Sequence, residues 1–154
     1  MIGILALATP FLSFAAPSFS DVPEGNEHFA AVEFLKAKNI VSGYPDGTFQ
    51  GGKTINRAEA LKLVMIAAGI KVEVPEEISF PDVKPEDWFF DYVKQAYSKK
   101  IVKGYDDGSF KPANNITAAE AIKIILVSFE SPLPTSVQSS PYSDVQPSDW
   151  HAPF

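Results

Sequence analysis

A seven-residue stretch that occurs twice, 61 residues apart, constrains this chain more than any other feature. Residues 43–49 read GYPDGTF and residues 104–110 read GYDDGSF. The similarity extends well beyond the stretch, because 18 of 50 positions are identical when 19–68 is aligned without a gap on 80–129. A repeat of this length predicts copies of one small structural unit that pack on their neighbours.

A third copy begins at Tyr142, where YSDVQPSDW matches FPDVKPEDW at residues 80–88. It stops at Phe154. The sequence therefore predicts five segments after residue 18. They are a first repeat at 19–68, a linker at 69–79, a second repeat at 80–129, a linker rich in proline and serine at 130–141, and the start of a truncated third repeat at 142–154.

Residues 1–18 carry no charge and combine an apolar run with small residues at their end. This pattern is typical of a secretory signal peptide. No Lys or Arg follows Met1 directly, so the positive first part of such a signal is missing. The alternative is a short buried helix broken by Pro10. The run is too short and too interrupted to span a membrane as a helix.

Each repeat is predicted to consist of two helices joined by the glycine turn. Apolar residues recur at helical spacing in the first helix. They are Phe29, Val32 and Leu35 in the first copy, and Phe90, Val93 and Ala96 in the second. The second helix begins with a capping box, formed by Asn56 and Glu59 in one copy and by Thr117 and Glu120 in the other.

An apolar stripe runs along each second helix, and two short helices cannot bury such a stripe alone. We therefore expect a mainly α fold in which the second helices pack into a shared core. With only two complete copies, Leu61, Val64, Ile122 and Ile125 should stay partly exposed. Apolar patches of this kind predict self-association of the chain.

Composition excludes several functions. The net charge is −6 and the isoelectric point is near 4.8, so a nucleic acid is not the expected partner. There is no cysteine, which excludes thiol catalysis and cysteine-bound zinc. His28 and His151 form no recognisable site, and an EF-hand would require a carboxylate where Lys53 stands. We expect no enzyme, cofactor or metal.

Three motifs at fixed spacing together make the chain similar to a known family. They are Phe19-Ser20-Asp21-Val22, the glycine turn, and Ile55-Asn56-Arg57-Ala58-Glu59-Ala60, and all three return in the second copy. In this combination the chain resembles the S-layer homology family of cell-wall anchoring modules. The resemblance implies three repeats around a pseudo-threefold axis, with the second helices in a central bundle. It also implies export and noncovalent binding of anionic, often pyruvylated, wall glycans in grooves between adjacent repeats.

The resemblance further implies that Arg57, the only arginine, is the main anion contact. A guanidinium is a planar, bidentate match for a carboxylate. We expect free backbone N–H groups at the helix start to assist it. In the second copy Ala118 occupies this position, and Lys103 or Lys111 is the alternative cation. The full set of candidate glycan-binding residues is Arg57, Asn56, Glu59, Tyr44, Asp46, Gly47, Trp88, Tyr105, Asp107, Thr117 and Glu120.

Structural roles compete with ligand binding at most of these positions. Glu59 and Glu120 fit a capping role, and both aspartates fit turn formation. The two tyrosines fit sugar stacking and packing on the nearest helix equally well. For Trp88 and for Trp150 in the third copy, the pattern favours packing in the core.

These patterns predict an anchoring module at the cell envelope. Its partner would be a secondary cell-wall polysaccharide or a peptidoglycan-linked glycan. Two alternatives remain open. One is the anchor segment of a larger surface enzyme or outer-membrane porin, and the other is a structural surface-assembly module without affinity for glycan.

Overall fold

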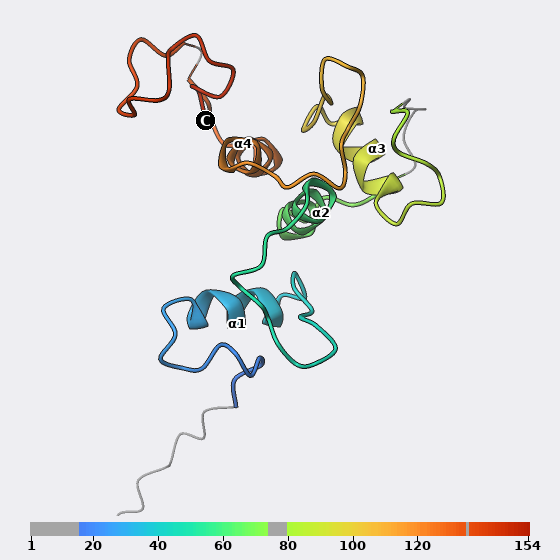
Figure 1. Ribbon diagram of the computed structural model, residues 1–154, viewed down its shortest axis with the longest axis vertical. Helices are drawn as coiled ribbons and strands as arrows, with labels where there is room; N and C mark the ends of the chain where they lie inside the picture. The colour runs from blue at the N-terminus through green and yellow to red at the C-terminus, as the bar shows by residue number, and fades with distance from the viewer. Residues whose placement is uncertain (1–15, 74–79, 135) are drawn as a thin grey trace, which may run out of the picture. The chain divides into compact units, whose positions relative to one another are not determined.

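A computed structural model describes residues 16–73, 80–134 and 136–154, and this part of the chain holds four α-helices and no strand (Figure 1). The mainly α fold is thereby confirmed. The helices are α1 (Phe29–Ala37), α2 (Arg57–Ala67), α3 (Phe90–Ser98) and α4 (Ala118–Ser128). Each repeat contributes two of them, as predicted. Residues 1–15 of the expected signal peptide and most of the first linker lie outside the described residues.

The chain divides into two compact units after Gly51. The first unit holds α1 and the first glycine turn, and the second holds α2, α3, α4 and the C-terminal segment. The division falls inside the first repeat of the sequence. Consequently α2 shares its core with residues of the second repeat.

In the first unit, a buried phenylalanine and an aspartate join the start of the repeat to its glycine turn. Phe19 is 2% exposed and lies beneath Gly43, whose φ of +77° favours glycine and where a Cβ would overlap the phenyl ring. Both carboxylate oxygens of Asp21 accept backbone N–H groups after the turn, from Phe49 at 2.7 Å and Gln50 at 2.8 Å. These bonds lower the pKa of Asp21.

The second unit repeats this arrangement. Asp82 accepts the N–H groups of Phe110 at 2.9 Å and Lys111 at 2.7 Å, and Phe80 lies beneath Gly104, which again has a φ of +77°. The two motifs that mark each repeat are therefore parts of one structural feature. The glycine allows close approach of the phenylalanine, and the aspartate holds the chain that leaves the turn.

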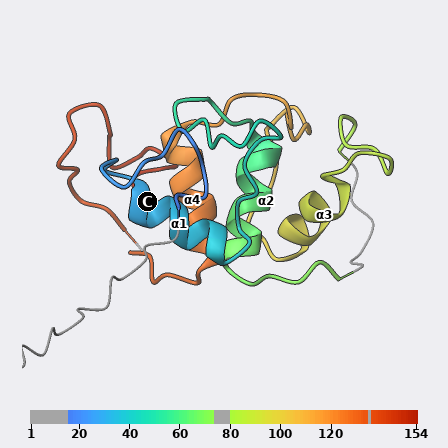
Figure 2. The ribbon, with the colours of Figure 1, turned by 90° about the horizontal axis from the view of Figure 1, so that it is seen from below.

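Helix α2 packs against both α3 and α4 in the second unit, and Figure 2 shows it between them. Leu61 and Met65 of α2 are fully buried among Val93 of α3, Ile124 of α4 and the ring of Phe110. The pairing of the two second helices is observed. The pseudo-threefold bundle stays a prediction.

Burial of the apolar stripes differs between the two second helices. The expectation that Leu61 is partly exposed is wrong, because α2 has helical neighbours on two sides and Leu61 is 0% exposed. Val64 is partly buried against the same core. Ile122 and Ile125 of α4 are 43% and 42% exposed, as expected.

Both capping boxes are confirmed. Asn56 accepts the backbone N–H of Glu59 at 2.9 Å, and the Glu59 carboxylate accepts that of Asn56 at 2.8 Å. Thr117 and Glu120 exchange the same pair of bonds at 3.3 Å and 3.0 Å at the start of α4. The first helices, α1 and α3, begin without a side-chain cap.

Candidate anion-binding site

The start of α2 is fastened to the loop before α4. The backbone N–H of Arg57 donates to the carbonyl of Asn114 at 2.9 Å, and that of Ala58 donates to the carbonyl of Pro112 at 3.1 Å. The expectation that this helix start offers free N–H groups to an anion is therefore wrong for both residues. These bonds instead hold Arg57 against the second repeat.

The Arg57 side chain lies in a pocket made by residues of the second repeat. Its guanidinium carbon lies 5.0 Å from the ring centre of Tyr105 and 5.1 Å from that of Phe110. Nη1 donates to the Glu120 carboxylate at 3.1 Å, and the side chain is only 9% exposed. Nε is buried without a hydrogen-bond acceptor among the described residues. The guanidinium thus keeps unused donor capacity in a place where water has little access.

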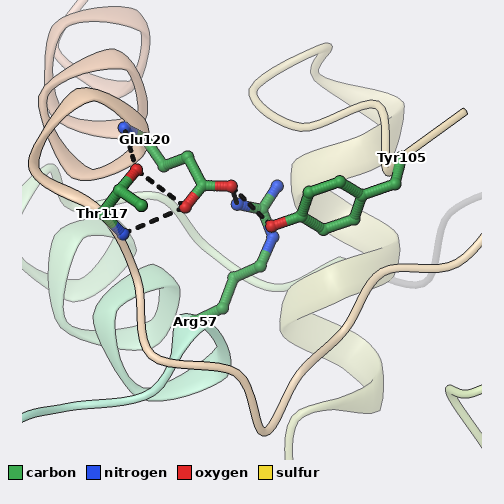
Figure 3. Close-up of polar contacts among 4 residues, drawn as sticks. All are labelled: Arg57, Tyr105, Thr117 and Glu120. Carbon is green, nitrogen blue, oxygen red and sulfur yellow. Dashed lines mark hydrogen bonds and ion pairs between the residues drawn. The ribbon is translucent and has the colours of Figure 1, made fainter.

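Glu120 links three elements of this site, as Figure 3 shows. Besides Arg57, the carboxylate accepts the Tyr105 hydroxyl at 2.5 Å and the N–H of Thr117 at 3.0 Å. Burial raises the pKa of Glu120, but the bonds from Tyr105 and Thr117 and the charge of Arg57 outweigh it, so the pKa lies below 4.5. Burial and the bond to Glu120 raise the pKa of Tyr105 above 10.0. Near neutral pH this is an ion pair with a neutral tyrosine as third member.

A cavity of about 320 Å³ opens beside this ion pair. Its lining includes three cations and two carboxylates: Arg57, Lys103, Lys123, Asp106 and Glu120. Burial, together with the charges of Lys103 and Arg57, lowers the pKa of Lys123. The lining thus has an excess of positive charge in a protein whose net charge is −6. Such a cavity favours an anionic ligand locally.

The structure brings together only some of the candidate residues. Arg57, Tyr105 and Glu120 line this cavity, and Thr117 adjoins it through its bonds to Glu120. Of the two alternative cations, Lys103 lines the cavity. The remaining candidates of the second unit have other surroundings.

Asp107 and Lys111 pair with each other at 2.9 Å. Asp107 also accepts the N–H and hydroxyl of Ser109, and these bonds lower its pKa. Asn56 and Trp88 line a different hollow of about 440 Å³. The Glu59 carboxylate is bonded to the backbone N–H of Asn56 in the capping box of α2.

Tyr44, Asp46 and Gly47 belong to the first compact unit, where they form the first glycine turn. Asp46 accepts the N–H of Thr48 at 3.0 Å and its hydroxyl at 2.6 Å, which lowers the pKa of Asp46. Gly47 has a φ of +80° and its N–H donates to the carbonyl of Tyr44. The turn-forming role of Asp46 is confirmed.

Lys123 and Trp150 line the cavity but were not among the candidates. Core packing was the wrong interpretation for the tryptophans, since Trp88 is 53% and Trp150 55% exposed. The sequence carried a signal for both residues. Lys123 is identical to its counterpart Lys62, and both tryptophans occupy the same place in their repeats.

Two further observations concern the described part of the chain only. No group of three or more histidine or acidic side chains there is arranged to hold a metal ion. None of its helices has both the length and the apolar character needed to cross a membrane.

Comparison with known families accounts for the two repeats. The model of the S-layer homology domain matches residues 18–61 and 79–122, which is more than half of the chain. The chain belongs to the S-layer homology domain family. Each matched segment includes a glycine turn and the start of a second helix, so the family region contains Arg57, Tyr105 and Glu120.

Several relatives of this S-layer homology module are named as surface-layer, cell-wall or anchoring proteins, and others as enzymes, such as an amylopullulanase of Thermoanaerobacterium thermosulfurigenes. A surface layer protein of Brevibacillus choshinensis is 36% identical over 126 residues, covering 79% of this chain and 11% of that protein. A middle cell wall protein of Brevibacillus brevis is 41% identical over 98 residues, covering 62% and 9%. A cellulosome-anchoring protein of Acetivibrio thermocellus is 29% identical over 138 residues, covering 86% and 30%.

The chain therefore spans between 9% and 30% of the length of these three relatives. Family membership and the nature of the relatives together assign the module to the cell surface and to anchoring there.

Proposed function

We propose that this chain anchors its protein noncovalently to the cell envelope by binding an anionic wall polysaccharide, with Arg57 as the main anion contact. The observation that carries the proposal is the cation-rich cavity at the junction of the two repeats, with a buried, incompletely paired guanidinium in its wall. A buried donor without an acceptor costs about 1–3 kcal/mol. An unpaired donor of this kind in the wall of a cavity therefore supports a ligand-binding role for the guanidinium.

Glu120 holds Arg57 in place without using up the guanidinium. One Nη1 bond is made to the carboxylate, while a guanidinium has five N–H donors in total. A carboxylate on a sugar, such as that of a pyruvyl group, can therefore share the guanidinium with Glu120. Lys103 and Lys123 add positive charge for the same ligand. The module needs no catalytic residue to perform this function.

Sedimentation with purified Gram-positive sacculi tests the proposal. The unaltered chain should pellet with the sacculi, and Arg57→Ala should reduce the pelleted fraction at least about tenfold, as expected when a charge-assisted contact is lost. Lys71→Ala is the matched control, because it removes one positive charge from an exposed residue outside the cavity. Equal sedimentation of the Arg57→Ala and Lys71→Ala proteins would contradict the proposal.

Removal of Arg57 also leaves Glu120 without its cation, which can destabilise the fold by itself. The double variant Arg57→Ala/Glu120→Gln removes both charges and keeps the net charge at −6. Circular dichroism melting shows whether this variant is folded. A folded double variant that no longer sediments shows that binding is lost and not the fold.

A second candidate function is structural assembly without glycan affinity. The exposed apolar residues Ile122 and Ile125 on α4 and Phe129 at its C-cap favour it, because such a row can pack against another surface protein. It differs from the first proposal in that the protein would self-associate in light scattering and would not sediment with the sacculi. In either case the module can serve as the anchor of a larger surface enzyme or porin.

A further inference from the structure

A hollow of about 460 Å³ lies in the second unit where three helices end. The C-cap residues of α2, α3 and α4, which are Ala68, Lys99 and Phe129, all line it. Ile101 also lines the cavity beside Arg57, but the other described lining residues differ between the two places. The hollow is therefore a candidate site of its own.

The wall of this hollow combines aliphatic side chains with one positive and one negative charge. Ile70, Ile101 and Val127 provide apolar surface. Lys99 and Glu130 are exposed, and neither forms an ion pair with another side chain in the part of the chain that the structure describes. A lining of this kind fits a small ligand that carries both charges on an aliphatic body.

A buried hydroxyl in the same wall has no hydrogen-bond partner among the described residues. Ser128 is 7% exposed and lines the hollow, and its Oγ is the unpaired atom. The counterpart in the first repeat is Ala67, so the helix does not require a hydroxyl at this position. A serine side chain turns about one bond, and a change of rotamer is enough to offer the hydroxyl to a ligand in the hollow. An unpaired buried polar group beside a hollow thus supports binding there.

Glu130 adopts a backbone conformation that favours glycine. Its φ is +51°, and its counterpart in the first repeat is Gly69 with a φ of +66°. A residue with a side chain is less stable in this conformation than glycine. A glutamate that stands there despite this cost supports a role for its carboxylate at the hollow.

The helix ends favour positive charge at the same place. The last turn of a helix carries a partial negative charge on its carbonyl groups, and three such turns end at this hollow. Together with the Glu130 carboxylate they suit an ammonium group. Lys99 suits a carboxylate on the same ligand.

We propose that this hollow binds an aliphatic amino acid as a zwitterion. Glu130 and the carbonyl ends of the helices bind its ammonium group, Lys99 binds its carboxylate, and the Ser128 hydroxyl adds a hydrogen bond. The aliphatic side chain packs on the apolar part of the wall. This site does not depend on the proposed binding of glycan.

NMR titration of the isotope-labelled chain with leucine tests the proposal. Leucine should shift the backbone amide signals of Lys99, Ser128 and Glu130 with a Kd on the order of 1 mM, as expected for so small a ligand. Isoamylamine keeps only the ammonium group of leucine, and isocaproate keeps only the carboxylate. Each should bind at least about fivefold more weakly, because one charge-assisted contact is lost. Equal binding of either analogue, or no shift at the hollow at about tenfold this leucine concentration, overturns the inference.

Two variants remove ligand contacts without weakening the fold. Ser128→Ala takes away an unpaired buried hydroxyl, and Glu130→Gly relieves the positive φ, so neither should lower the melting temperature. Both should bind leucine at least about fivefold more weakly than the unaltered chain. Glu86→Gln is the control, because it removes one negative charge from an exposed residue outside the hollow. A folded Glu130→Gly protein that binds leucine as tightly as this control contradicts the proposal.

A third variant tests the assignment of the two charges. Lys99→Met should weaken the binding of leucine and leave that of isoamylamine unchanged, since isoamylamine has no carboxylate. If Lys99→Met binds leucine as the unaltered chain does, the zwitterion is the wrong ligand class.

Discussion

At the scale of single residues, Glu120 does more than its capping position suggests. The same carboxylate completes the cap of α4, pairs with Arg57 of the other repeat and accepts the Tyr105 hydroxyl. A residue of this kind links local helix formation to the contact between repeats. Its counterpart Glu59 has the same cap in α2 and is exposed.

Acid should weaken the folded state partly through Glu120. Its pKa is lower in the folded protein than the ordinary value of 4.5, so folding favours the ionised form. This stabilisation is complete above about pH 4.5, the pKa of the unfolded chain, and is lost as the pH falls through the lower pKa of the folded state. Tyr105 stays neutral over this range, because its pKa is raised.

Urea unfolding between pH 7 and pH 3 measures this effect. Glu120→Gln should be less stable than the unaltered chain by about 1–3 kcal/mol at pH 7, the usual cost of leaving a buried charged partner unpaired. The difference should shrink below pH 4.5. A difference that stays constant over this range would show that the charge of Glu120 does not contribute.

At the scale of elements, the second helices start at a side-chain cap and the first helices do not. The caps of α2 and α4 explain why these two helices begin at equivalent residues, 57 and 118. They also set the orientation of the first turn, from which Arg57 and Glu120 project toward each other (Figure 3).

Loss of a cap should therefore affect both the helix and the site. Thr117→Ala removes the acceptor for the Glu120 N–H and a hydroxyl bonded to its carboxylate at 2.9 Å. We expect a loss of about 1 kcal/mol in the free energy of unfolding. Thr54→Ala is the control, since Thr54 is exposed and lies outside the helices. Equal stability of the two variants in urea would refute the capping role of Thr117.

At the scale of the whole molecule, the second helices are unequally covered. Ile122 and Ile125 of α4 and Phe129 at its C-cap form an exposed row, whereas Leu61 and Val64, the counterparts of the two isoleucines on α2, lie against a core. An exposed apolar row favours contact with another surface.

We expect this row to cause weak self-association of the chain. Sedimentation equilibrium at rising concentration should show a mean mass above 16.8 kDa. Ile125→Lys should lower it toward that value by placing a charge in the row, and Lys71→Glu serves as a control for altered surface charge. A chain that remains monomeric up to millimolar concentration would contradict the expectation.

Local sequence is sufficient to predict the repeats and the family. It also predicts the four helices with their turns and caps. Hydrophobic period, capping pairs and glycine turns act over a few residues, so each can be recognised without knowing what it packs against. Arg57 also stands out in the sequence, as the single arginine at a motif position. Its role as an anion contact remains a proposal.

The tertiary structure decided which residues surround Arg57. Its ion pair with Glu120 joins residues 63 positions apart. Its side chain is buried against Tyr105 and Phe110, and Lys123 and Trp150 line the same cavity. All of these contacts depend on how one repeat packs against the next. Backbone bonds from Arg57 and Ala58 to Asn114 and Pro112 also close the helix start, which the sequence predicts to be open to an anion. Burial and long-range electrostatics arise only when distant segments come together, and for this reason the local pattern could not predict them.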